Sequence, residues 1–275
     1  MLTLDARNDL ADVVPGRRLR KPRVGFLGVG WIGRHRMAAM AESQLLDIAA
    51  MADATPDALR QAQALVPQAT PLHSLDALLA EDLDALVIAT PSALHAEQAE
   101  AALARGFAVF CQKPLARSAA ESERVIAAAR RADRLLGVDL SYRHTQAMRR
   151  IRTLVAAGDL GHVHAVDLVF HNAYGPDKRW FQDPALSREG RDAVVETTFR
   201  GRARRACGNV GGSFYDVGAE LRRGTTARTI ADGPDGWGGL AAVQWARRLA
   251  AGERYDLHSR RLVTVAEVID RIYGR

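Results

Sequence analysis

The sequence predicts an α/β protein with a doubly wound parallel sheet, followed by a smaller α+β domain. Short apolar runs alternate with helical segments through residue 140, which is typical of parallel strands joined by crossover helices. One run, residues 85–90, is almost continuously apolar, as expected for a strand buried on both faces. After residue 140 a half-buried alternating pattern appears, which favours a mainly antiparallel sheet.

The chain of 275 residues is long enough for two ordinary domains. We expect an N-terminal extension over residues 1–22, a first domain over 23–141 and a second over 142–275. The last helix is expected to pack back on the first domain.

The first domain is expected to hold six strands and the helices between them. The expected strands are 24–27, 46–52, 70–73, 85–90, 107–111 and 135–140. Helix boundaries carry recognisable signals: Thr55 as a cap with Pro56 at the first helical position, the capping box Ser118-Ala-Ala-Glu121, and Gly106 just beyond a helix end.

The second domain is expected to contain fewer strands. The expected strands are 163–170, 194–199, 213–217 and, more weakly, 228–231. Helices are expected over 146–157, 240–251 and 263–272.

The strongest local signal is the glycine-rich turn after the first strand. Gly28, Gly30 and Gly33 have the spacing G-x-G-x-x-G. The first glycine permits a tight turn, the second lets backbone approach a pyrophosphate, and the third allows close packing of helix on strand. The N–H groups near Trp31 and Ile32 would then face the phosphates.

Asp53 ends the second expected strand. A carboxylate there can accept hydrogen bonds from both ribose hydroxyls of an adenosine, which makes this unit a dinucleotide-binding, Rossmann-type domain. It also predicts NAD rather than NADP, because a 2′-phosphate would meet a negative charge that Ala54 does not offset. The alternative is a glycine-rich turn and an ordinary helix start.

The net charge of +6 is almost entirely arginine, since lysine occurs only at Lys21, Lys113 and Lys178. Arginine is spread through alanine-rich segments and does not form the one-sided stripe of a nucleic-acid binder. The nearest cluster, within residues 200–205, is expected to be a solvated loop, with an anionic partner site as the alternative.

Cys111 and Cys207 form no disulfide framework in a chain of this length, and Cys111 is expected to be a reduced core thiol. The glycines after residue 24 make a poor signal peptide, and no run has the length of a membrane span. We therefore expect a cytoplasmic protein without membrane or nucleic-acid partners.

Three local matches resemble one family. They are the glycine fingerprint with Asp53, the run Ala89-Thr90-Pro91-Ser-Ala-Leu-His95, and Cys111-Gln112-Lys113-Pro114-Leu115. The chain resembles the glucose-fructose oxidoreductase, inositol dehydrogenase and MocA family over residues 23 to about 184. The closing residues 235–273 are also similar.

This resemblance implies hydride transfer between a nicotinamide cofactor and a hydroxyl or keto group of a sugar, cyclitol or related compound. It assigns Lys113 to catalysis and to the nicotinamide end of the cofactor, and Thr90, Pro91, His95 and Gln112 to cofactor binding. The chemistry of lysine agrees, because a neighbouring cationic ring favours its neutral, basic form, which arginine does not adopt. The alternative is a surface lysine before a proline.

The chain departs from the family in two places. Gln112 replaces a glutamate, and the Asp-x-Gly-x-His motif of the second domain is absent. The nearest match is Asp216-Val-Gly218-Ala-Glu220, with glutamate at the histidine position. We interpret residues 184–190 as a junction where a central piece of the second domain is missing, so this match would be fortuitous.

Arg143, His171 and Glu220 are the weak substrate-site candidates that remain. The histidines and cysteines show no metal-ligand spacing, and no metal is expected. The rival hypothesis is a dinucleotide-binding regulator or a catalytically impaired relative of such enzymes. A homo-oligomer formed through the second-domain sheet is the expected assembly.

Overall fold

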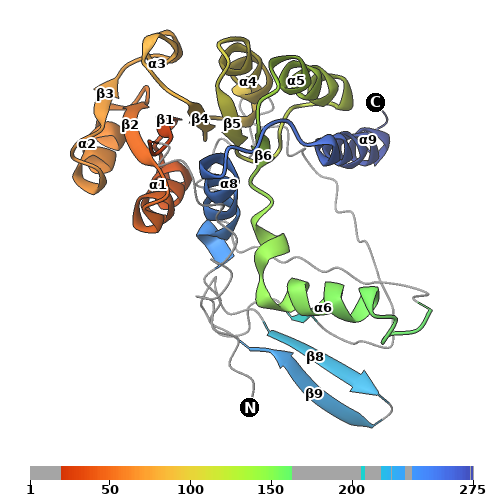
Figure 1. Ribbon diagram of the computed structural model, residues 1–275. Coiled ribbons are helices and arrows are strands. Elements are labelled where there is room, and N and C mark those ends of the chain that lie inside the picture. Colours follow the sequence, from red (N-terminus) through yellow and green to blue (C-terminus); the bar gives the residue numbers. More distant parts are fainter. Residues whose placement is uncertain are drawn as a thin grey trace.

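The computed structural model describes residues 20–162, 206–207, 218–223, 225–232, 237–272 and 274 (Figure 1). The strands expected over 163–170, 194–199 and 213–217 lie outside these residues, as do His171, Asp216 and the junction at 184–190.

Six parallel strands form the main sheet, in the order β3-β2-β1-β4-β5-β6. Their bounds are β1 Arg23–Leu27, β2 Asp47–Ala52, β3 Thr70–Leu72, β4 Ala85–Ile88, β5 Ala108–Cys111 and β6 Leu136–Val138. This confirms the doubly wound sheet that the sequence predicts. The strand order reverses between β1 and β4, the point where ligands bind in open sheets of this type.

Helices cover both faces of this sheet (Figure 1). They are α1 Trp31–Ser43, α2 Pro56–Leu65, α3 Leu75–Ala80, α4 His95–Ala104, entered through the 3₁₀ turn η1 Ser92–Leu94, and α5 Ala119–Ala132. Successive strand residues alternate between two cores: Val87 packs with α1 and α2, whereas Leu86 and Ile88 pack with α3, α4 and α5. This two-sided burial explains the continuous apolar run.

Most of the expected boundary signals act as proposed. Ser118 accepts a hydrogen bond from the N–H of Glu121 at 3.2 Å, and Gly106 adopts a positive φ of 85° after α4. Thr55 is a correction: it occupies the N-cap of α2, but its side chain makes no capping hydrogen bond. Its N–H instead donates to Asp53 at 2.8 Å.

After β6 the chain enters the 3₁₀ turn η2 Ser141–His144 and α6 Gln146–Ala156. A small antiparallel sheet follows, in the order β7-β8-β9, made by Ala206–Cys207, Gly218–Arg223 and Thr226–Ala231. The β8–β9 hairpin lies beneath α6 in Figure 1. β9 therefore begins two residues before the strand expected over 228–231. β8 begins directly after the strand expected over 213–217.

The last helices return to the parallel sheet. The 3₁₀ turn η3 Trp237–Gly239 leads into α8 Leu240–Ala250, and η4 Leu257–Arg260 leads into α9 Arg261–Ile272. Trp245 of α8 is buried in the core beside α1, while Leu262 and Val263 pack against the core beside α5. Asp270 of α9 accepts a hydrogen bond from the N–H of Ala119, at the start of α5.

Gly137 of β6 makes room for α8. A Cβ at this position would lie 2.5 Å from Cδ1 of Trp245 and 3.0 Å from Cδ2 of Phe110. The two rings also contact each other, with centroids 5.5 Å apart. The absence of a side chain at residue 137 therefore sets how closely α8 approaches the sheet.

We predict that Gly137→Ala lowers the free energy of unfolding by about 1–3 kcal/mol, the usual cost of overpacking a core. Urea denaturation followed by Trp fluorescence measures the effect. Gly218→Ala in β8 is the matched control, because its Cβ would meet only an ordinary contact at 3.6 Å. Equal stability of the two variants would contradict this account of α8 packing.

Candidate dinucleotide and substrate site

Strand register brings the expected site residues to one edge of the sheet. Leu27 of β1 pairs with Ala52 of β2 and with Ile88 of β4. Ile88 in turn pairs with Cys111 of β5. Four parallel strands therefore end level, and the turns that begin with Gly28, Asp53, Ala89 and Gln112 are neighbours at their carboxyl ends.

The glycine loop has the geometry that its sequence predicts. Gly28 has a φ of 84°, and a Cβ there would lie 2.6 Å from the backbone of Ala89. A Cβ on Gly33 would lie 2.2 Å from the carbonyl oxygen of Gly28. By contrast, the same atom on Gly30 would meet nothing within 4 Å, so this glycine faces open space, where a pyrophosphate fits.

The start of α1 suits an anion. Gly30 is its N-cap and supplies no side-chain hydrogen bond, and the first turn carries no acidic residue. Trp31 is 60% exposed and Ile32 half-buried at this helix start. The positive end of the helix dipole therefore points toward the open side of the loop.

Asp53, the first residue after β2, stabilises the glycine loop. Its carboxylate accepts hydrogen bonds from the N–H of Val29 at 2.7 Å and from the N–H of Thr55 at 2.8 Å. Arg34 donates to the carbonyl oxygen of Val29 at 2.9 Å. Both backbone groups of Val29 are thus held by side chains, a role for Asp53 and Arg34 that the motif spacing did not reveal.

The turn after β4 carries Thr90 and Pro91, and His95 begins α4. The Thr90 hydroxyl donates to the amide oxygen of Gln98 at 2.5 Å. The ring of His95 is 1% exposed and lies 2.8 Å from the carbonyl oxygen of Thr90 and 2.7 Å from that of Pro114. Burial lowers the pKa of His95, and the charge of Lys113 acts in the same direction. Direct cofactor contacts by these residues stay predictions.

Lys113 is exposed at the turn after β5 and precedes Pro114 through a cis peptide bond. The next two residues, Leu115 and Ala116, are buried in the core beside α4 and α5. The lysine is therefore carried on a short turn anchored by a strand on one side and by core packing on the other. This position, at the carboxyl edge of the sheet, is compatible with the catalytic role implied by the resemblance.

Gln112 points into a buried polar network that sequence reasoning missed. Its amide donates to Oδ2 of Asp139, which also accepts from Nε of Arg36 at 2.5 Å. Ser141 joins the network through Oδ1 of Asp139 and through Arg36 at 2.9 Å. All four residues are at most 8% exposed. A cofactor contact by the Gln112 side chain stays a prediction; the structure gives it this internal partner.

This network explains why glutamine is compatible with the position. One carboxylate, Asp139, already faces one guanidinium, Arg36, in a buried environment. A glutamate at residue 112 would add a second carboxylate against the first, which is costly away from water. Nearby, burial raises the pKa of the Cys111 thiol, as expected for an inert core cysteine.

The substrate candidates are less closely grouped. Arg143 is exposed in η2, next to His144, whose pKa is lowered by burial and then by the charge of Arg143. Glu220 lies in β8 and accepts a hydrogen bond from Arg222 at 2.8 Å. The hairpin that carries Glu220 packs against α6, and its substrate role stays a prediction.

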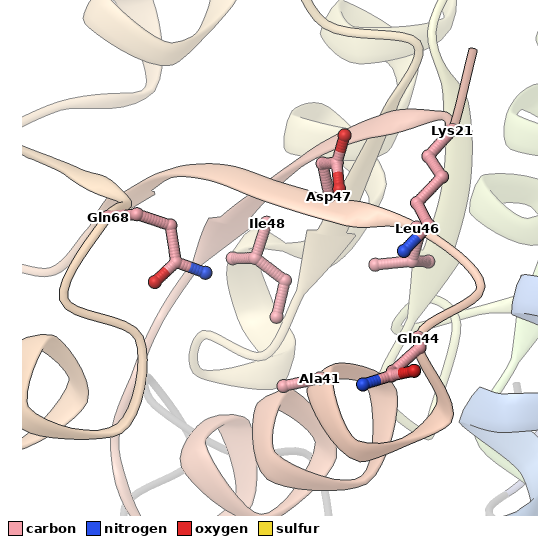
Figure 2. Close-up of a pocket in the computed structure, with 7 residues that line it drawn as sticks. All are labelled: Lys21, Ala41, Gln44, Leu46, Asp47, Ile48 and Gln68. Atoms are coloured by element: carbon pink, nitrogen blue, oxygen red, sulfur yellow. The ribbon is translucent and has the colours of Figure 1, made fainter.

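A cavity of about 250 Å³ lies at the opposite edge of the sheet, near the starts of β2 and β3 (Figure 2). Lys21, Gln44, Asp47 and Gln68 are among its lining residues. It is remote from the strand ends that gather the expected site residues.

Within the described ranges, no three or more potential metal ligands lie together as a group. None of the helices in these ranges has both the length and the apolar character of a membrane-spanning helix.

Residues 22–140 match a family described as an oxidoreductase family with an NAD-binding Rossmann fold. The putative UDP-kanosamine synthase oxidoreductase subunit of Amycolatopsis mediterranei is 34% identical over 165 residues, which cover 58% of this chain and 44% of the relative. Inositol 2-dehydrogenase 3 of Saccharopolyspora erythraea is 30% identical over 157 residues, covering 56% and 46%. The chain thus spans about half the length of the curated relatives it matches.

Two solved structures extend the comparison. The WlbA dehydrogenase from Bordetella pertussis, in complex with NADH and UDP-GlcNAcA, is 32% identical, with a TM-score of 0.50 over 52% of this chain and 44% of that one. KijD10, a 3-ketoreductase from Actinomadura kijaniata in complex with NADP and TDP-benzene, has a TM-score of 0.70 over 92% and 97%. At 20% identity, the second likeness concerns the fold alone.

We predict that Gln112→Glu lowers the free energy of unfolding by about 3 kcal/mol, the order of cost of an uncompensated buried charge. The double variant Gln112→Glu/Asp139→Asn should recover most of this loss, because a single carboxylate then faces Arg36. Chemical denaturation at neutral pH measures all three proteins. A double variant no more stable than Gln112→Glu alone would show that the two carboxylates do not interact.

Proposed function

We propose that this chain, whose residues 22–140 match an oxidoreductase family with an NAD-binding Rossmann fold, transfers hydride between a nicotinamide cofactor and a carbinol or carbonyl carbon. The substrate is a sugar, a cyclitol or a related polyol. The UDP-kanosamine synthase oxidoreductase subunit, the inositol 2-dehydrogenase and the WlbA dehydrogenase named above support this class.

The observation that carries the proposal is the level ending of β1, β2, β4 and β5. Along this edge, the open space at Gly30 and the start of α1 suit a pyrophosphate. Asp53, which follows β2, would accept hydrogen bonds from an adenosine ribose. Lys113 follows β5, on the far side of β4 from the glycine loop. This order would allow an extended dinucleotide to lie across the strand ends with its reactive ring toward β5.

Lys113 would act on the substrate hydroxyl. When bound, the nicotinamide ring supplies a hydride acceptor or donor. Oxidation of a carbinol also requires the hydroxyl proton to leave, and the amine of Lys113 would accept it; in reduction the ammonium would return it. Thr90 and Pro91 would shape the adjoining turn, and Arg143 is the charged group of η2 proposed to meet the substrate.

We further propose NAD as the preferred cofactor. The Asp53 carboxylate would repel a 2′-phosphate, and the following Ala54 provides no positive charge to offset it. The carboxylate is fixed by two backbone N–H groups, so it could not readily swing aside to admit the phosphate. The WlbA dehydrogenase is in complex with NADH, whereas KijD10, which is similar in fold alone, is in complex with NADP.

A second candidate is a dinucleotide-binding regulator or a catalytically impaired relative. The absence of an Asp-x-Gly-x-His motif favours it, since that motif supplies a proton acceptor in the family. Calorimetric titration with NAD⁺ and NADH, followed by a screen of sugars and cyclitols for a change in NADH absorbance, separates the two. Tight cofactor binding without turnover of any compound would support the regulator.

We predict that Asp53→Asn narrows the preference for NAD⁺ over NADP⁺ while leaving NAD⁺ affinity within a few-fold. Asparagine removes the charge but keeps an oxygen for the N–H of Val29. Asp53→Ser should narrow the preference and also weaken the binding of both cofactors, because the hydrogen bonds from the carboxylate to the loop are lost. Binding titrations measure both effects, with Asp57→Ser as the exposed control; an unchanged preference in Asp53→Asn would refute the assignment.

We predict that Lys113→Ala lowers kcat by about 10²–10⁴-fold, the typical contribution of a positioned acid or base. NAD⁺ affinity should stay within a few-fold of the wild-type value. Lys21→Ala, at the opposite edge of the sheet, is the control and should turn over normally. Wild-type kcat in the Lys113→Ala variant would remove this residue from the mechanism.

A further inference from the structure

The ring of His95 joins two turns that the parallel ladder leaves separate. The last β4–β5 ladder bond on this side runs from the N–H of Gln112 to the carbonyl oxygen of Ile88, at 2.8 Å. Beyond it, one chain turns at Thr90 and the other at Lys113. His95 lies between them, with one ring nitrogen 2.8 Å from the carbonyl oxygen of Thr90 and the other 2.7 Å from that of Pro114.

Both partners of the ring are backbone carbonyls, which only accept hydrogen bonds. A neutral ring donates to one of them at a time, and a protonated ring donates to both. Because His95 is only 1% exposed, water does not compete with either carbonyl for the ring. The ring therefore fills a narrow slot between the Thr90 and Pro114 carbonyl groups, and the width of the ring sets the distance between them.

The placement of His95 along the chain makes this bridge possible. The 3₁₀ turn η1 reverses the chain between Pro91 and the first residue of α4, so the ring folds back on the Thr90 carbonyl five residues earlier. Ala96, the next residue, is buried in the same core as Leu115 and Ala116. Packing thus fixes the helix that carries the ring and the segment that follows Pro114.

We infer that His95 is a positioning residue, whose ring holds the Lys113–Pro114 turn at a fixed place against the Thr90 turn and so aims Lys113 along the edge of the sheet. The inference rests on the proposed function for its consequence in catalysis, but the placement of Lys113 can be tested without it. Lys113 is close enough for its charge to lower the pKa of His95.

The readout is the Lys113 amine itself. The chain has three lysines, so reductive methylation with ¹³C-formaldehyde gives a simple ¹³C NMR spectrum. The signal of Lys113 is the one that disappears in Lys113→Ala. His95→Phe fills the slot with a ring that has no nitrogen, and His95→Gln keeps one donor group. His73→Phe, at an exposed position after β3, is the matched control.

In His95→Phe, the Lys113 signal should move toward that of a free lysine and lose at least half of its NAD⁺-induced shift, while the Lys21 signal stays unchanged. His95→Gln should fall between this variant and the wild type. A Lys113 signal identical in wild type and His95→Phe, with or without NAD⁺, would overturn the inference, even if the variant melts at a lower temperature. A merely structural role would produce that outcome.

Failure of the proposed function can be distinguished from failure of the inference about His95. If wild-type protein does not respond to NAD⁺, the function fails, and the comparison of Lys113 signals without cofactor still decides the role of His95. If His95→Phe does not fold, ¹⁵N spectra of the wild-type imidazole decide it. A ring N–H protected from solvent exchange and close to protons of Thr90 or Pro114 supports the bridge, and an N–H that exchanges as fast as that of His73 overturns it.

Discussion

Four neighbouring strands of the parallel sheet end at the same level, and every proposed feature of the site depends on this alignment. In a parallel ladder all chains run in one direction, so each turn that follows a strand leaves from the same edge. The pairing of Leu27 with Ala52 and Ile88, and of Ile88 with Cys111, makes neighbours of turns far apart in the sequence. Without that register, the glycine loop and Lys113 would be unrelated motifs.

The turns at this edge are held by side chains as well as by the ladder. Asp53 and Arg34 occupy the two backbone groups of Val29, and the His95 ring bridges the turns after β4 and β5. A loop held by donors and acceptors of fixed geometry loses less conformational freedom when a ligand binds, which favours affinity. The proposed site is therefore largely assembled before a cofactor arrives.

Beneath the turns, the Arg36–Asp139 pair links α1 to the end of β6. A buried ion pair contributes little net stability by itself, but removal of one partner leaves an uncompensated charge. Gln112 donates to the same carboxylate oxygen as Arg36, and Ser141 donates to the other, so both oxygens accept hydrogen bonds. Its location, where the chain passes from β6 into η2, ties the first domain to the residues that follow it.

The sequence alone determined the α/β class, the alternation of the six strands with helices, and the positions of Gly28, Gly30, Gly33, Asp53 and Lys113 after strands. These follow from local chemistry: apolar runs mark buried strands, and the turn out of β1 requires glycine. Its boundary signals were also largely correct, because capping depends on a few consecutive residues.

Only the tertiary structure decided which partners those residues have. Arg36 and Asp139 stand about a hundred positions apart, and nothing near either residue announces their ion pair. The resemblance assigns His95 and Gln112 to cofactor binding, which stays a prediction. Their partners within the protein came from the structure: the His95 ring lies between two carbonyls, and Gln112 faces Asp139. Such contacts depend on how strands and helices from distant parts of the chain pack together, a property that local patterns of residues do not encode.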